Sequence, residues 1–82
     1  MVNFDHYKEA RELAEELSKE KIEHFANRII NAMEECSTGT EIFMALRWNI
    51  EQLLTTKELA CPKRIIDKAS CLYRELDKAL QQ

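Results

Sequence analysis

The residues that could carry out chemistry are few in this chain, and none stands in a catalytic pattern. The three cysteines, Cys36, Cys61 and Cys71, lack metal-type spacing, and their odd number argues against a disulfide framework. Neither His6 nor His24 lies near a cysteine or serine in an arrangement that would activate a nucleophile. The sequence therefore predicts a protein that is not an enzyme and binds no metal, with both histidines exposed on helices.

Carboxylates are abundant, but their spacing is not that of a cofactor site. A di-iron bundle needs Glu-x-x-His on two helices. The pair Glu20 and His24, one helical turn apart, stands alone. The single Gly leaves no glycine-rich phosphate loop. We therefore expect no cofactor, and we interpret the paired glutamates at 15–16 and 34–35 as solvated helix faces.

The composition indicates that helices position these side chains. One Gly and one Pro in 82 residues supply too little turn chemistry for a β-sandwich or barrel. The length predicts one domain, residues 1–82, and no apolar stretch approaches the ~20 residues that span a bilayer. No leader of basic and then apolar residues follows Met1, and the cysteines suit a reducing compartment. We expect a cytoplasmic protein that does not bind membranes.

Apolar residues recur at helical spacing in four segments, at about 3–17, 19–36, 39–54 and 62–80. The residues suited to begin these helices are Asn3 or Asp5, Ser18, Thr38 with Glu41, and Pro62. Leu17 and Ile22 flank Ser18 at the spacing of a hydrophobic staple, and one continuous helix through Ser18 is the alternative. Four amphipathic helices with short links predict an all-α fold, a single small antiparallel helical bundle.

The third segment has an unusual feature outside its main apolar stripe. At about 100° per residue, Met44 and Trp48 fall on the far side of the helix, one turn apart. One interpretation is that a neighbouring helix covers them. The other is an exposed partner-binding patch, because Met and aromatic residues are enriched in protein interfaces. Arg47, Glu51 and Gln52 would form its polar rim.

Charge is uneven along the chain, whose net charge is −3. Residues 1–36 hold nine acidic and five basic residues, whereas residues 59–82 hold three acidic and five basic ones. The glutamates of the first segment, among them Glu12 and Glu16, form either a solvated face or a surface for a basic partner. The acidic balance argues against nucleic acid as the partner, although the basic last segment keeps that hypothesis open.

The segment from Ser37 to Leu54, STGTEIFMALRWNIEQLL, resembles small helical bacterial proteins that are encoded beside toxins. In particular, it is similar to immunity proteins of contact-dependent growth inhibition and bacteriocin-type systems. The resemblance covers about a fifth of the chain and transfers no site residue. It implies a cytoplasmic protein that binds one toxin domain, often a nuclease, and blocks it.

Physical chemistry is compatible with that implication. A nuclease active site is basic because it binds phosphates, and an acidic helical surface can steer towards it. Two alternatives of other classes stay open. One is a structural or regulatory helical protein that self-associates as a homo-oligomer, and the other is a small DNA-binding regulator.

Overall fold

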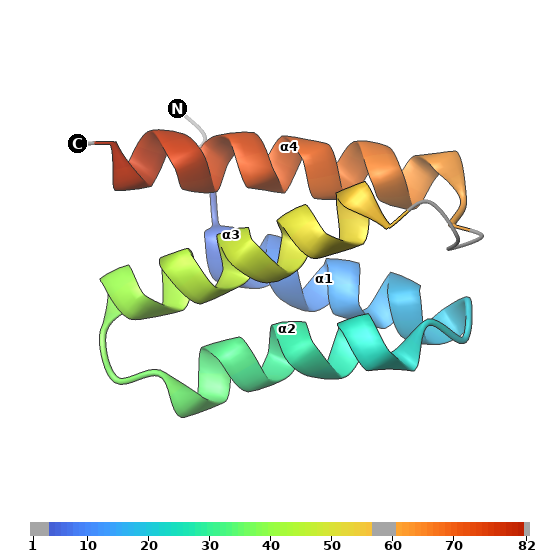
Figure 1. The fold of residues 1–82 in the computed structure, drawn as a ribbon, viewed down its shortest axis with the longest axis horizontal. Helices are drawn as coiled ribbons and strands as arrows, with labels where there is room; N and C mark the ends of the chain where they lie inside the picture. The colour runs from blue at the N-terminus through green and yellow to red at the C-terminus, as the bar shows by residue number, and fades with distance from the viewer. Residues whose placement is uncertain (1–3, 57–60, 82) are drawn as a thin grey trace.

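The computed structural model describes residues 4–56 and 61–81, and four α-helices lie in this part of the chain. They are α1 (His6–Lys19), α2 (Glu23–Glu35), α3 (Gly39–Thr55) and α4 (Lys63–Leu80). Each helix runs antiparallel to the next, and α4 returns beside α1 to close the ring (Figure 1). This arrangement confirms the prediction of a small all-α bundle.

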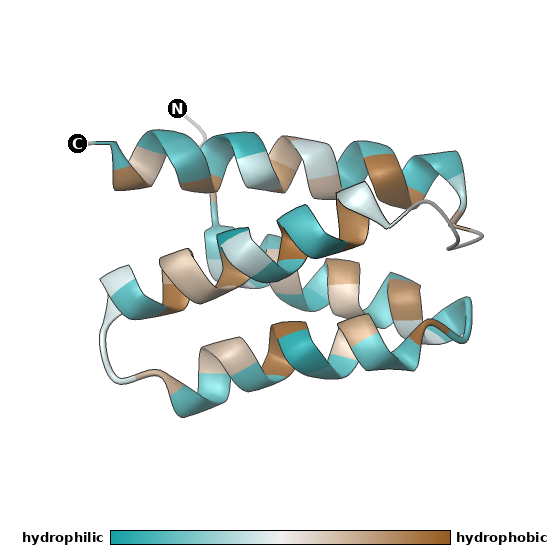
Figure 2. Cartoon of the chain, in the orientation of Figure 1, coloured by the Kyte–Doolittle hydropathy of each residue, from teal (hydrophilic) through white to brown (hydrophobic). Residues whose placement is uncertain are grey.

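The core lies where the apolar stripes of the four helices meet, and Figure 2 shows the apolar bands along each helix. The predicted stripes supply this core. Fully burying one such side chain stabilises the fold by roughly 1.5–3 kcal/mol. The large side chains that are less than 2% exposed are Leu13, Leu17, Ile29, Leu46, Ile50, Leu53, Ile65, Leu72 and Leu76.

Two of the predicted helix caps are confirmed. The Lys8 N–H donates to Asp5 Oδ1 at 3.1 Å, and the Glu41 N–H donates to Thr38 Oγ1 at 3.2 Å. Each bond satisfies a backbone donor that has no partner within its helix. Pro62 stands one residue before the first residue of α4, so that boundary is within one residue of its predicted place. The alternative cap, Asn3, lies outside the described residues.

The junction of α1 and α2 differs from the prediction. The α1 helix continues through Ser18, so Ser18 does not cap α2. The Ile22 N–H donates to Leu17 O at 2.8 Å, and the Lys21 N–H donates to Ser18 O at 3.0 Å. These are the two bonds of a Schellman motif, in which Lys21 takes the left-handed conformation with φ of 63°. Leu17 and Ile22, both buried, therefore form the apolar pair that ends α1 and not a staple that begins α2.

Candidate partner-binding surface

Met44 and Trp48 are exposed on the outer face of α3, so no neighbouring helix covers them. Their exposed fractions are 53% and 52%, whereas Leu46 and Ile50 of the same helix are fully buried. Within residues 4–56 and 61–81, Met44 and Trp48 are the large hydrophobic side chains recorded as exposed. An exposed Met and Trp one turn apart on a regular helix form a small preformed apolar patch.

On the α2 side of this patch, Trp48 contacts a cation. The guanidinium carbon of Arg28 lies 5.0 Å from the centroid of the Trp48 ring, which is the geometry of a cation–π interaction. Trp48 and Arg28 line a hollow of about 390 Å³ between α2 and α3, together with Asn31, Glu35 and Asn49. A cation–π contact at an exposed site contributes about 0.5–1 kcal/mol, so Arg28 favours this position of the indole.

Asn49 is a polar residue of this hollow that the sequence analysis missed. Its side chain is only 9% exposed, and its Nδ2 donates to Ala45 O at 2.9 Å. Asn49 follows Leu46 by three residues and precedes Leu53 by four, and both leucines are buried. That spacing already indicated an inward-facing position, because residues three and four apart share one helix face.

On the α4 side, a second hollow of about 340 Å³ is lined by Met44, Arg47, Trp48, Glu51 and Tyr73. Arg47 Nη1 donates to Asp77 Oδ1 at 2.8 Å, which ties this wall of α3 to α4. The Tyr73 hydroxyl donates to Glu51 Oε1 at 3.2 Å. That hydrogen bond, with partial desolvation and the nearby carboxylates, raises the pKa of Tyr73 above its ordinary value.

Four of the six predicted partner-binding residues thus come together around this hollow, and two do not. Met44, Arg47, Trp48 and Glu51 line it. Glu12 and Glu16 instead line a different hollow, between α1 and α4, which is about 450 Å³ in volume. Gln52, predicted for the rim, is half-buried and does not line the hollow beside Trp48.

Three glutamates of α1, and Glu20 at its C-terminal end, form ion pairs with α4. Arg64 Nη2 lies 3.1 Å from both Glu16 Oε2 and Glu20 Oε2. The Lys68 ammonium donates to Glu9 Oε1 at 3.0 Å and to Glu12 Oε1 at 3.1 Å. Two cations of α4 thus pair with four carboxylates along one seam of the bundle, so the pairing offsets half of the negative charge there.

The pKa of Lys68 reflects its place in that seam. Partial burial lowers the pKa, because desolvation disfavours the charged ammonium. The hydrogen bonds and charges of Glu9 and Glu12 outweigh this effect and raise the pKa above its ordinary value. Lys78 of α4 also pairs with a carboxylate, that of Glu75, at 3.4 Å. Three of the five basic residues of α4 are thus in ion pairs, which reduces the positive charge that this helix presents to a phosphate backbone.

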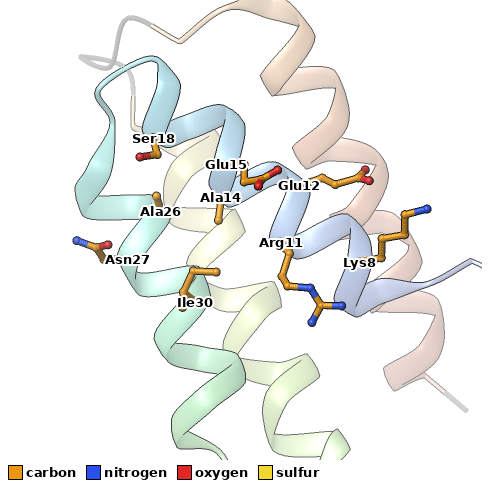
Figure 3. Close-up of a pocket in the computed structure, with 9 residues that line it drawn as sticks. All are labelled: Lys8, Arg11, Glu12, Ala14, Glu15, Ser18, Ala26, Asn27 and Ile30. Atoms are coloured by element: carbon orange, nitrogen blue, oxygen red, sulfur yellow. The ribbon is translucent and has the colours of Figure 1, made fainter.

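A fourth hollow, of about 480 Å³, lies between α1 and α2 (Figure 3). Ala14, Ala26 and Ile30 lie between the two helices, and charged side chains of α1 surround them. Glu12 and Lys8 point away from α2 (Figure 3). Within the described ranges, no group of three or more His, Cys, Asp or Glu side chains could hold a metal ion.

The two histidines differ in their surroundings. His24 is exposed, as predicted. The prediction for His6 is wrong, because its ring lies 4.6 Å from the Phe43 ring and 5.0 Å from the Phe4 ring between centroids. Its Nε2 also lies 3.4 Å from Glu75 O. The rings of Phe4 and Phe43 lie against His6, which is half-buried, and the contact with Phe43 joins α1 to α3, which helical periodicity does not reveal.

The cysteines differ in exposure. Cys71 is exposed on α4. Cys36 and Cys61 are half-buried. Burial and the nearby Glu20 raise the pKa of the Cys61 thiol, and Arg64 only partly opposes them. Cys61 therefore carries less of the reactive thiolate at neutral pH than an ordinary cysteine does.

No protein-family model, curated protein or solved structure matches this chain. None of the helices in the described residues has the length and apolar character needed to cross a membrane. The function of the protein is therefore inferred from the surface of the bundle.

Proposed function

We propose that the protein is a binding module without catalytic activity, which binds a bacterial toxin domain through the α3 patch and neutralises it. The observation that carries the proposal is the exposure of Met44 and Trp48 on a regular helix. A rigid aromatic side chain with a defined position loses little conformational entropy on binding. Arg47 and Glu51 stand beside it as polar groups that can surround a buried contact.

The nature of the partner follows from the resemblance and from charge. The segment that resembles immunity proteins, residues 37–54, is the one that carries the patch. The net charge of −3 favours a basic partner such as a nuclease domain. The glutamates of α1 contribute less to this attraction than their number suggests, because α4 pairs with three of them and with Glu20 at the end of the helix.

The experiment is to express the protein encoded by the adjacent reading frame, with and without this chain, and to measure bacterial growth. We expect the neighbour to be toxic alone and harmless with this chain, and the two purified proteins to form a tight 1:1 complex by calorimetry. Trp48→Ala should weaken binding by about 2 kcal/mol or more, since truncation of a central Trp typically has that effect. His24→Ala, which removes an exposed ring from α2, is the matched control.

Two results would overturn different parts of the proposal. A neighbour that is not toxic, or toxicity that this chain does not relieve, would refute the proposed function. Neutralisation that survives Trp48→Ala with affinity changed by less than ~1 kcal/mol would refute the site but not the function. Circular dichroism of each variant checks that the helices remain folded.

Self-association is the second candidate, because the exposed patch suits another copy of the same chain. Two patches meeting about a twofold axis would bury both Trp48 side chains. Sedimentation of the purified protein measures this directly. A monomer at several hundred micromolar would exclude this candidate.

A further inference from the structure

We propose that the hollow between α3 and α4, beside Trp48, receives an arginine side chain of the protein partner. This inference rests on the proposed function, since it names the chemistry of the group that the patch binds. The hollow is lined by Trp48, Tyr73, Glu51, Met44 and Arg47. It combines two aromatic rings, a thioether and a carboxylate, a set that suits a planar cation.

The charges around the hollow favour a cation. Arg47 is already paired with Asp77 at 2.8 Å, so its positive charge is locally balanced. Glu51 adds a carboxylate that forms no ion pair with a cationic side chain of residues 4–56 and 61–81. Its recorded contact is the Tyr73 hydroxyl, which donates to Oε1 at 3.2 Å. The other carboxylate oxygen is left to accept from an incoming group.

The α2 side of the same indole shows that this ring accepts a guanidinium. Arg28 lies there at 5.0 Å from the ring centroid, and Glu35 lines the same hollow as Arg28. The α2 side of Trp48 is therefore occupied by the chain itself, and the α4 side is open. An arginine entering on the α4 side could place its plane against Trp48 and donate to Glu51 through its N–H groups.

Arginine fits this site better than lysine does. A guanidinium is planar, weakly hydrated and able to stack on a ring while it donates to a carboxylate. An ammonium is compact and strongly hydrated, so it loses more hydration on entering a half-exposed aromatic hollow. The proposal therefore predicts a preference between two side chains of equal charge.

The test uses the fluorescence of Trp48, the single Trp of the chain, during titration with short peptides at low salt. Tetra-arginine amide is the probe, tetra-lysine amide has equal charge, and tetra-citrulline amide is the neutral isostere. We expect a saturable change with tetra-arginine, binding at least ~3-fold weaker with tetra-lysine, and none with tetra-citrulline. Glu51→Gln should weaken tetra-arginine binding by roughly 5-fold or more.

The matched control is Glu15→Gln, which removes one exposed carboxylate from α1, away from the hollow. We expect it to change the affinity by less than about 2-fold, because screened charges far from the site act weakly. Equal losses for Glu51→Gln and Glu15→Gln would overturn the proposal, since binding would then follow net charge alone. Equal affinity for the arginine and lysine peptides, or no saturable change, would also overturn it.

These outcomes are separable from those of the proposed function. Failure of tetra-arginine to bind, with the toxin still neutralised through Trp48, would refute the arginine site and leave the function standing. Specific binding of tetra-arginine, with no toxin neutralised, would support the site and refute the function.

Discussion

Lys21 offers a sharp test of how α1 ends. It takes a φ of 63° at the left-handed position of the Schellman motif, and its side chain is exposed. A non-glycine residue in this conformation loses roughly 1–2 kcal/mol, whereas glycine adopts it without that strain. Glycine also makes the unfolded chain more flexible, which offsets about 0.5–1 kcal/mol of the gain.

Lys21→Gly should therefore stabilise the protein by about 0.5–1 kcal/mol. For a domain of this size, that free energy corresponds to a rise of roughly 2–8 °C in the melting temperature. The assay is thermal unfolding by circular dichroism, together with urea unfolding. The matched control is Lys19→Gly, the same exchange at an exposed helical position, which should destabilise by up to ~1 kcal/mol. An unchanged or lowered stability for Lys21→Gly would refute the left-handed C-cap.

Three further predictions concern the seam, the core and the thiols. Lys68→Met should destabilise the protein by up to ~1 kcal/mol at low salt and by less in 1 M NaCl, as measured by urea unfolding. Because folding raises the pKa of Lys68, the stability that Lys68 contributes is complete below its ordinary pKa and is lost as the pH rises through its pKa in the folded protein. The variant should therefore lose less stability than the parent protein at alkaline pH. A constant difference between the two proteins across that range would contradict this assignment. Leu72→Ala should destabilise the protein by about 2–5 kcal/mol in the same assay, because Leu72 is fully buried, whereas Met44→Ala, at an exposed position, should change the stability by less than about 0.5 kcal/mol. Equal losses of stability would show that Met44 is part of the core. Iodoacetamide at pH 8 should modify Cys71 faster than Cys61, as followed by peptide mass spectrometry. Because the pKa of Cys61 is raised, the difference between the two rates should become smaller at higher pH. Equal rates at pH 8 would count against the burial of Cys61.

The helix ends show how local signals succeed and fail. Thr38 with Glu41 was predictable because a cap joins residues three apart in one segment. The pair Leu17 and Ile22 was ambiguous, because a staple at a helix start and a Schellman contact at a helix end have the same spacing. The residue type of Lys21 did not indicate the end of α1, since the left-handed position of a Schellman motif is usually glycine or asparagine.

The candidate site was partly predictable for the same reason. Met44 and Trp48 could be placed opposite the buried stripe from spacing alone, because the 3.6-residue period is a property of one helix. Arg28 over the indole and Tyr73 beside Glu51 could not, because these contacts join different helices. They depend on which helix lies on each side of α3 and on how far each one is shifted along its axis.

Taken alone, the order of residues determined the four helices, most of the apolar side chains that each one buries, and the place of the lone Trp outside the main stripe of its helix. Only the packed bundle decided that Glu16 meets Arg64, 48 positions away, and that Glu12 meets Lys68. The physical reason is that helical periodicity comes from hydrogen bonds four residues apart, whereas lateral neighbours come from how apolar stripes of different helices fit together. Glutamates that look like an open acidic surface in the linear chain are therefore partly matched by cations within the folded molecule.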